Sequence, residues 1–333
     1  MGLSRLTCQA PPLVQFPNFT LNSEALMSHS SLAQEYRSPA TSAPLGFMAA
    51  FVTVAIWTTW IISTRFTVHA EHPVSAELLA FLRFSTAALL LSPYWWRLRP
   101  VPKGISRWAL LGLLFAGIPY LASVLLGLTY APALEAGPLL TGSLPLFVAL
   151  LSALCLGERF TRLRLLGLAL IALGVVAITG HGLFNMTSGA WRGHLMILLA
   201  ALSWSIYTVA FRKTGLTGTA AASFIAFWSL ILWVPFNWHA IVTELSTLPV
   251  TVLITQVLIQ GVLAGIVALI TYATAVSHLG ASRTAAITAI TPASATLAAI
   301  LVLGEVPGLF ALIGCGLLMV GVVLASGVLN RTA

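Results

Sequence analysis

Charged side chains are scarce in this 333-residue chain: they make up 7% of it, whereas hydrophobic residues make up 59%. Soluble globular domains carry about 25% charged residues, because a water-facing surface must be covered by polar groups. A chain with so little charge cannot cover such a surface, so the composition predicts a protein whose solvent is lipid. The net charge of +8 does not indicate a nucleic-acid partner, because the basic residues fall in short loops between apolar runs and form no stripe.

Aspartate is absent, and the eight glutamates form no close carboxylate pair inside an apolar run, so acid–base catalysis is not expected. The two lysines, Lys103 and Lys213, stand outside any Gly-Lys-Ser/Thr context, which excludes a phosphate-binding loop for ATP. The three cysteines show no paired spacing, and no His-Glu-x-x-His motif occurs. We therefore expect no catalytic residue, no metal and no cofactor.

Ten apolar stretches follow a polar N-terminal segment, and most are about 20 residues long, the length that crosses a bilayer as a helix. Backbone polar groups in lipid must bond internally, so each stretch is predicted to be helical. The sequence thus predicts an all-α integral membrane protein with ten transmembrane helices. The predicted spans are 46–64, 75–96, 106–128, 133–156, 163–180, 193–211, 219–238, 250–274, 282–303 and 307–328.

The chain repeats itself at an offset of 147 residues, without a gap. Pairs of identical residues at this offset include Trp57 and Trp204, Arg65 and Arg212, Pro145 and Pro292, Gly157 and Gly304, Glu158 and Glu305, Gly167 and Gly314, and Gly174 and Gly321. Such a repeat in an apolar chain is typical of transporters built from two related halves. The predicted parts are a flexible cytoplasmic tail (1–45), a first repeat (46–180), an external linker (181–192), a second repeat (193–328) and a C-terminal tail (329–333).

The basic residues predict the orientation of the chain. With the N-terminus inside, thirteen of the sixteen Lys and Arg fall on the cytoplasmic side, as the positive-inside rule requires, so both termini are predicted to be cytoplasmic. Five helices per half is an odd number, so the halves insert in opposite senses. The Gly157–Glu158 turn, followed by Arg159 and Arg162, is predicted to be cytoplasmic, and the matching Gly304–Glu305 turn external.

Pro145 and Pro292 lie near the middle of equivalent predicted helices. Proline removes an internal hydrogen bond and clashes with the preceding turn, so the helix bends or opens there. Broken helices at equivalent places in two halves mark the solute site of many transporters. We therefore expect the two prolines to shape a cavity; a packing kink without solute contact is the alternative.

Arg83 is the only strongly charged residue well inside a predicted helix. A charge is costly in lipid, so such a residue usually faces a cavity or a partner. It could pair with Glu77, hold an anionic group of the solute, or act as a gate. The alternative is a structural anchor whose long side chain reaches the external face. Glu77 and Glu135 are the candidates for proton coupling, but both lie near helix ends, which favours facilitated export or coupling through another residue.

Aromatic side chains stand at matching places in the first and sixth predicted helices. Trp57 and Trp60 are three residues apart, as are Trp204 and Tyr207, so each pair shares a helix face. Facing pairs from the two halves could enclose a ring or an apolar ligand, and an interfacial aromatic belt is the alternative. Weaker candidates for the same pathway are Tyr120, Tyr130 and Tyr272.

Short motifs in both halves resemble the EamA-type transporters of the drug/metabolite transporter superfamily. The motifs are Arg83–Phe84, Leu144–Glu158, Gly167–Val176, Ile290–Glu305 and Gly314–Val323. The resemblance implies two inverted halves around a central cavity, working by alternating access, and export of amino acids, related metabolites or toxic small molecules from a bacterial cell. It therefore implies a small-molecule solute and the lipid bilayer of the inner membrane as partners. The second half has no arginine at the position of Arg83.

The sequence therefore predicts a bacterial inner-membrane exporter of amino acids or related small metabolites, and the aromatic side chains make bulky or aromatic amino acids a reasonable hypothesis. An importer of sugars or other polar metabolites is the alternative within transport. Side chains that could supply hydrogen bonds to such a solute are Thr58, Thr59, Ser63, Thr141 and Ser143. A membrane-embedded enzyme or a structural membrane protein is the alternative from another class.

Overall fold

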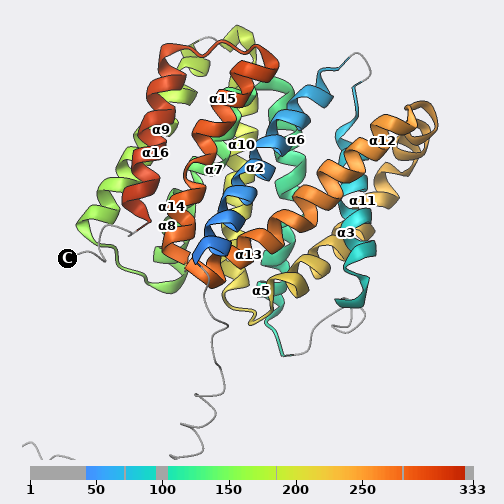
Figure 1. The fold of residues 1–333 in the computed structure, drawn as a ribbon, viewed down its shortest axis with the longest axis horizontal. Helices are drawn as coiled ribbons and strands as arrows, with labels where there is room; N and C mark the ends of the chain where they lie inside the picture. The colour runs from blue at the N-terminus through green and yellow to red at the C-terminus, as the bar shows by residue number, and fades with distance from the viewer. Residues whose placement is uncertain (1–42, 71–72, 95–103, 185, 280, 327–333) are drawn as a thin grey trace, which may run out of the picture. The chain divides into compact units, whose positions relative to one another are not determined.

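The computed structural model describes residues 43–70, 73–94, 104–184, 186–279 and 281–326, and within these ranges every regular element is helical (Figure 1). In this described part of the chain, seven helical stretches are long and apolar enough to cross a membrane. The predicted tails lie outside the described residues, except that the first helix already begins at Ala43. The all-helical class predicted from the sequence is confirmed.

The first half contains α2 (Ala43–Val68), α3 (Ala76–Leu90), α5 (Arg107–Leu113), the 3-10 turn η1 (Leu114–Ala116), α6 (Ile118–Tyr130), α7 (Ala133–Gly142), α8 (Leu144–Leu156) and α9 (Arg162–Phe184). The second half contains the 3-10 turn η2 (Met186–Ser188), α10 (Ala190–Phe211), α11 (Gly218–Thr247), α12 (Val250–Gln256), the π-helical segment η3 (Val257–Val267), α13 (Ala268–Leu279), α14 (Ala281–Thr288), α15 (Thr291–Leu303) and α16 (Leu309–Ala325). Of these, α3, α15 and α16 are shorter than the seven membrane-length stretches.

Two helices are interrupted at equivalent positions, immediately before a proline. The chain leaves α7 at Ser143 and starts α8 with Pro145 in its first turn, and it enters α15 through Ile290 with Pro292 in the first turn. The first turn is where a missing N–H group costs no intrahelical bond, so proline starts a new helix there instead of distorting an old one. The break that the two prolines predict is therefore present in both halves.

Two glycines end α8 and α15 in the same left-handed conformation, with φ of +67° at Gly157 and Gly304. A side chain at such a φ is strained, and glycine is not. This conformation turns the next residue back onto the end of its helix. The backbone nitrogen of Glu158 donates to the carbonyl oxygen of Ser152 at 3.4 Å, and that of Glu305 donates to the carbonyl oxygen of Ala299 at 3.3 Å. The two glutamates therefore leave their helices with the same geometry.

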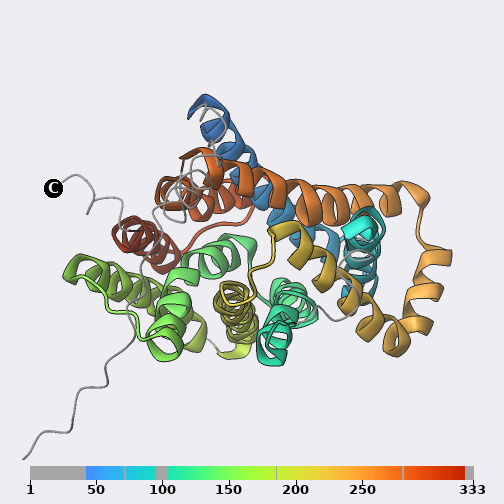
Figure 2. The same ribbon diagram turned by 90° about the horizontal axis from the view of Figure 1, so that it is seen from below.

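The equivalent helices α9 and α16 lie side by side (Figures 1 and 2) and pack through glycines. A Cβ atom on Gly167 would lie 2.7 Å from the carbonyl oxygen of Gly321, and one on Gly174 would lie 2.8 Å from that of Gly314. Small residues allow this close approach of backbones. An early glycine of one helix meets a late glycine of the other, so the two helices run antiparallel.

The other helices pack reciprocally between the halves. Helix α10 of the second half lies along α6 of the first half. Their repeat equivalents, α2 and α13, lie along each other in the same way, and α3 packs on its own equivalent, α11. The largest buried apolar cluster accordingly draws on both halves, with Leu79 and Leu121 from the first and Ile197 and Leu318 from the second. Neither half is a self-contained bundle, and the surface where they meet is the interior of the protein.

Candidate functional site

A row of aromatic rings joins α2, α6 and α10, and we call Trp60, Tyr120, Trp204 and Tyr207 the aromatic row. Successive ring centroids lie 6.3, 4.8 and 5.2 Å apart. Trp60 is only 4% exposed, which is not the position of an interfacial belt residue. Tyr120 stands between the tryptophans of the two halves, so the predicted aromatic pairs meet through this ring.

Trp57 lies outside the row and stacks on Tyr272 of α13, with centroids 5.7 Å apart and an interplanar angle of 30°. This contact has a counterpart in the row, where Trp204 of α10 packs on Tyr120 of α6. In each case the tryptophan of one half contacts a tyrosine of the other half. The repeated tryptophans therefore mark two matching crossings between the halves.

Two glutamines, for which the sequence predicted no role, hold α2 from the second half. The side chain of Gln260, in η3, is fully buried; it accepts a hydrogen bond from Trp60 Nε1 at 2.6 Å and donates one to Thr64 Oγ1 at 3.0 Å. Gln256 donates to Thr67 Oγ1 at 2.9 Å. The available signal was two amides inside an apolar run, which are costly to bury without partners. Gln260 fixes the orientation of the Trp60 ring, and both glutamines bind α2.

Arg83 reaches the same ring from α3, with its guanidinium carbon 5.0 Å from the Trp60 ring centroid. Its Nη1 is buried and has no hydrogen-bond partner among the described residues. The predicted candidate partner, Glu77, forms no ion pair with it in this part of the chain; its backbone carbonyl accepts from Trp233 Nε1 at 3.1 Å. A buried guanidinium donor without a partner is costly, and it leaves a free donor for an anionic group.

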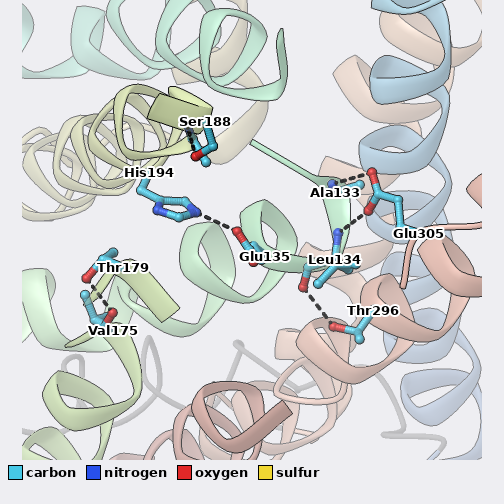
Figure 3. A network of polar contacts seen from close by, with 10 residues as sticks. Ala133, Leu134, Glu135, Val175, Thr179, Ser188, His194, Thr296 and Glu305 are labelled. Carbon is cyan, nitrogen blue, oxygen red and sulfur yellow. Dashed lines mark hydrogen bonds and ion pairs between the residues drawn. The ribbon is translucent and has the colours of Figure 1, made fainter. Parts of the chain in front are cut away.

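Glu135, in the first turn of α7, meets His194 of α10 (Figure 3). Its Oε2 lies 2.7 Å from Nε2 of the imidazole, whose side chain is 3% exposed. The sequence indicates Glu135 as a candidate but not His194, because a single histidine near a helix end carries no signal of its partner. The pair joins the two halves, since α7 belongs to the first and α10 to the second.

Glu158 and Glu305 also bind across the halves. Arg65 Nε lies 3.2 Å from Glu305 Oε1, and Arg212 Nη2 lies 2.8 Å from Glu158 Oε1. Both arginines and both glutamates belong to the repeated set of residues, but their pairing was not predicted. Each glutamate follows a left-handed glycine, but its partner arginine lies far away in the sequence, so no pattern in the chain indicates the pairing.

The prolines lie at the edges of this interior. Pro292 is buried, and two residues further on Ser294 Oγ lies 2.6 Å from Thr58 Oγ1 of α2. Pro145 is half-buried. The breaks therefore lie where α8 and α15 approach the other half, and the role of both prolines in shaping a cavity stays a prediction.

Two pockets lie away from the aromatic row. The first, of about 500 Å³, is lined by Ser75, Glu244 and their neighbours at the start of α3 and the end of α11. The second, of about 580 Å³, lies between α5, α6, α10 and α11 and includes Trp108 and Ser229. Residues of the aromatic row line neither pocket, so this conformation does not open the row to either of them.

Fold and interior define a class: a helical membrane protein built from two interlocked, related halves with a polar and aromatic interior. The model of the EamA-like transporter family matches the chain twice, over residues 44–180 and 191–327, again 147 residues apart. The chain belongs to this family. It is a multi-pass membrane protein of a transporter family.

Two curated relatives and one solved structure illustrate what this chain is similar to. A "Probable terminal-alkyne amino-acid exporter" of Streptantibioticus cattleyicolor is 30% identical over 190 residues, 56% of this chain and 62% of that protein. The "Uncharacterized transporter YetK" of Bacillus subtilis is 24% identical over 197 residues, 57% of this chain and 59% of that protein. The matches thus span less than two thirds of either relative. A solved crystal structure, 23% identical, has the same fold with a TM-score of 0.54 and covers 87% of this chain and 99% of its own.

Proposed function

We propose that this protein exports amino acids or related small metabolites by alternating access across a bacterial inner membrane. Ten helices cross the membrane, the halves are inverted, and both termini are cytoplasmic. The observation that carries the proposal is the unpartnered Nη1 of Arg83 beside an aromatic row to which both halves contribute. The name of the relative from Streptantibioticus cattleyicolor, an amino-acid exporter, supports the solute class.

The arrangement suits an amino acid with a large apolar side chain. Arg83 binds the carboxylate of the solute, because a guanidinium offers paired donors to a carboxylate. The rings of Trp57 and Trp204 pack on the side chain of the solute, since aromatic faces enclose apolar or ring-bearing ligands. Pro145 and Pro292 interrupt the chain at the starts of α8 and α15, which flank the proposed solute site.

The pair of Glu135 and His194 is the better candidate for proton coupling. Both groups are titratable, they lie 2.7 Å apart, and they join the two halves. Glu77 offers no such pairing in the described residues. A proton gained or lost at Glu135 or His194 changes a contact between the halves, which is what coupling to alternating access requires.

Flux into proteoliposomes across a panel of amino acids tests the function. We expect uptake of apolar and aromatic amino acids, and a fall of about tenfold or more in the kcat/KM of Arg83→Gln, because a charge-assisted bond is lost. Trp57→Ala and Trp204→Ala weaken transport of the same solutes. Arg192→Gln is the matched control, since Arg192 is exposed and contacts the neighbouring ring of Trp191. Transport of unrelated solutes alone would refute the solute class.

The hydrogen bonding of the interior supports import of sugars less well than export of amino acids. A polar solute needs free hydrogen-bonding side chains, but Gln260 is bonded to Trp60 and Thr64, and Thr58 is bonded to Ser294. The unpartnered group at the aromatic row is a cation, which favours an anionic group on the solute. Competition by sugars in the flux assay, without competition by amino acids, would reverse this preference.

A further inference from the structure

The two Arg–Glu pairs exchange partners between the halves. Arg65 and Arg212 are repeat equivalents, and so are Glu158 and Glu305. Yet Arg65 binds Glu305, and Arg212 binds Glu158, so each pair takes one member from each half. Applying the repeat to one pair generates the other. They are two copies of a single contact between the halves.

The two copies lie at opposite ends of the helices. Glu158 stands just before α9, and Glu305 stands just before α16. These two helices run antiparallel, because Gly167 near the start of α9 meets Gly321 near the end of α16. Their starting points are therefore at opposite ends, and each end carries one Arg–Glu pair.

The copy at Glu305 is tightly made. Besides Arg65, the Glu305 carboxylate accepts the backbone N–H groups of Ala133 at 3.0 Å and Leu134 at 2.9 Å, the first residues of α7 (Figure 3). Arg65 also donates to the carbonyl oxygen of Leu128 at 2.6 Å. A carboxylate at a helix N-terminus satisfies free N–H groups and faces the positive end of the helix dipole. The side chains of Arg65 and Glu305 are only 19% and 14% exposed.

Helix packing adds to the contacts at the Glu305 end. At the Glu305 end α15 lies against α7, where a Cβ on Gly137 would be 2.7 Å from that of Ala295. Thr296 Oγ1 donates to the carbonyl oxygen of Leu134 at 3.2 Å. This end is closed by a helix cap, an ion pair and direct backbone packing.

The copy at Glu158 is loose. Arg212 is bonded to Glu158 at 2.8 Å and, weakly, to Ser152 Oγ at 3.5 Å, and the side chains of Arg212 and Glu158 are 52% and 28% exposed. An exposed ion pair of this kind contributes little to holding two helices together. The same pair of residue types, Arg and Glu, is therefore fully engaged at one end and weakly engaged at the other.

We propose that the two copies are alternating latches, of which one is fully made in each state of the transport cycle; this inference rests on the alternating-access function proposed above. The present conformation is latched at the Glu305 end. In the opposite state Glu158 caps the first turn of α14, where Ala281 is the repeat equivalent of Leu134, and Arg212 donates to the carbonyl oxygen of Ala275, the equivalent of Leu128. The contacts of Glu305 are then released.

The test follows two cysteine reporters at repeat-equivalent places, introduced by Ala295→Cys and Val148→Cys after Cys8, Cys155 and Cys315 are replaced by alanine. Ala295 is fully buried between α15 and α7, whereas Val148 on α8 is half-buried. The rate of reaction with a water-soluble maleimide, measured on detergent-solubilised protein without solute, reports how open each end is. We expect the reporter at 295 to react more slowly than the reporter at 148.

Glu305→Gln removes the charge that is engaged here, so it shifts the population toward the opposite state. We expect the reporter at 295 to react about tenfold faster, or about 1.4 kcal/mol in the equilibrium, and the reporter at 148 to react more slowly. Glu158→Gln weakens the opposite state, so it leaves the reporter at 295 protected and speeds the reporter at 148. Shifts of the same sign in the two variants, or no shift in either, would overturn the latches.

A charge exchange separates a latch from a simple ion pair. Arg65→Glu combined with Glu305→Arg restores an ion pair but places a cation at the N-terminus of α7, so the reporter at 295 stays as reactive as in Glu305→Gln. Full rescue by the exchange would show that capping is unimportant and would refute the proposal. If Glu305→Gln does not fold, Arg65→Gln keeps the cap in place and gives the same shift at a smaller size. The maleimide reaction rates are measured without solute. A flux assay that shows no transport of amino acids would therefore refute the proposed function without refuting the latches.

Discussion

The scaffold of this protein obeys its repeat closely, whereas its candidate solute site does not. Helix breaks, glycine caps and the α9–α16 contact all recur at the same offset. In the site, however, Arg83 corresponds to Leu230 of the second half, and Trp60 corresponds to Tyr207. Under the proposed alternating access, two equivalent states need two equivalent halves, whereas a single solute at their junction needs only one set of contacts.

The largest effect is expected from removal of Arg83, the charge that only the first half carries at this position. Arg83→Gln should lower kcat/KM for carboxylate-bearing solutes by about tenfold or more, because the free donor beside Trp60 is lost. Leu230→Arg in the same background should not restore transport, since the first half has Leu113 at the repeat position of Gln260 and so offers no amide to orient a ring. Flux into proteoliposomes measures both. Recovery of transport in the double variant would show that the site is as symmetric as the scaffold.

Substitution of the packing glycines tests the symmetric contact between α9 and α16. Gly167→Ala and Gly321→Ala each place a Cβ within 2.8 Å of backbone atoms of the other helix, so each should cost about 1–3 kcal/mol of stability. Gly316→Ala on α16 is the matched control, because nothing lies within 4 Å of a Cβ there. Thermal unfolding in detergent measures the three. Equal stability of all three variants would argue against close packing of α9 and α16.

The glycine caps should give the smallest effect, and an equal one in both halves. Gly157→Ala and Gly304→Ala force a side chain into a φ of +67°, at a cost of about 1–2 kcal/mol each. Gly308→Ala, which has an ordinary φ of −73° and open space, should be neutral. The same unfolding measurement checks them. A large difference between the two cap variants would mean that the two turns are not equivalent in solution.

Much of the fold was predictable because lipid leaves the chain few choices. Apolar runs near 20 residues gave the helices, and the repeat gave the equivalence of Pro145 with Pro292. Pairings between helices were not predictable, since the partner of Glu135 or of Arg65 lies far away in the sequence and only the folded halves bring it near. The π-helical turn that aims Gln260 at Trp60 has no pattern in the sequence that distinguishes it from an ordinary helix.

The central claim is that the halves are inverted copies, and the most direct test places two repeat-equivalent residues relative to the membrane. Arg159→Cys and Val306→Cys, each in a chain without its native cysteines, put a label beside the two glutamate turns; both positions are exposed. On intact cells a membrane-impermeant maleimide should label the variant at 306 and should reach the variant at 159 only after permeabilisation. Labelling of both from the same side would contradict the inverted arrangement, and with it the solute path between the halves.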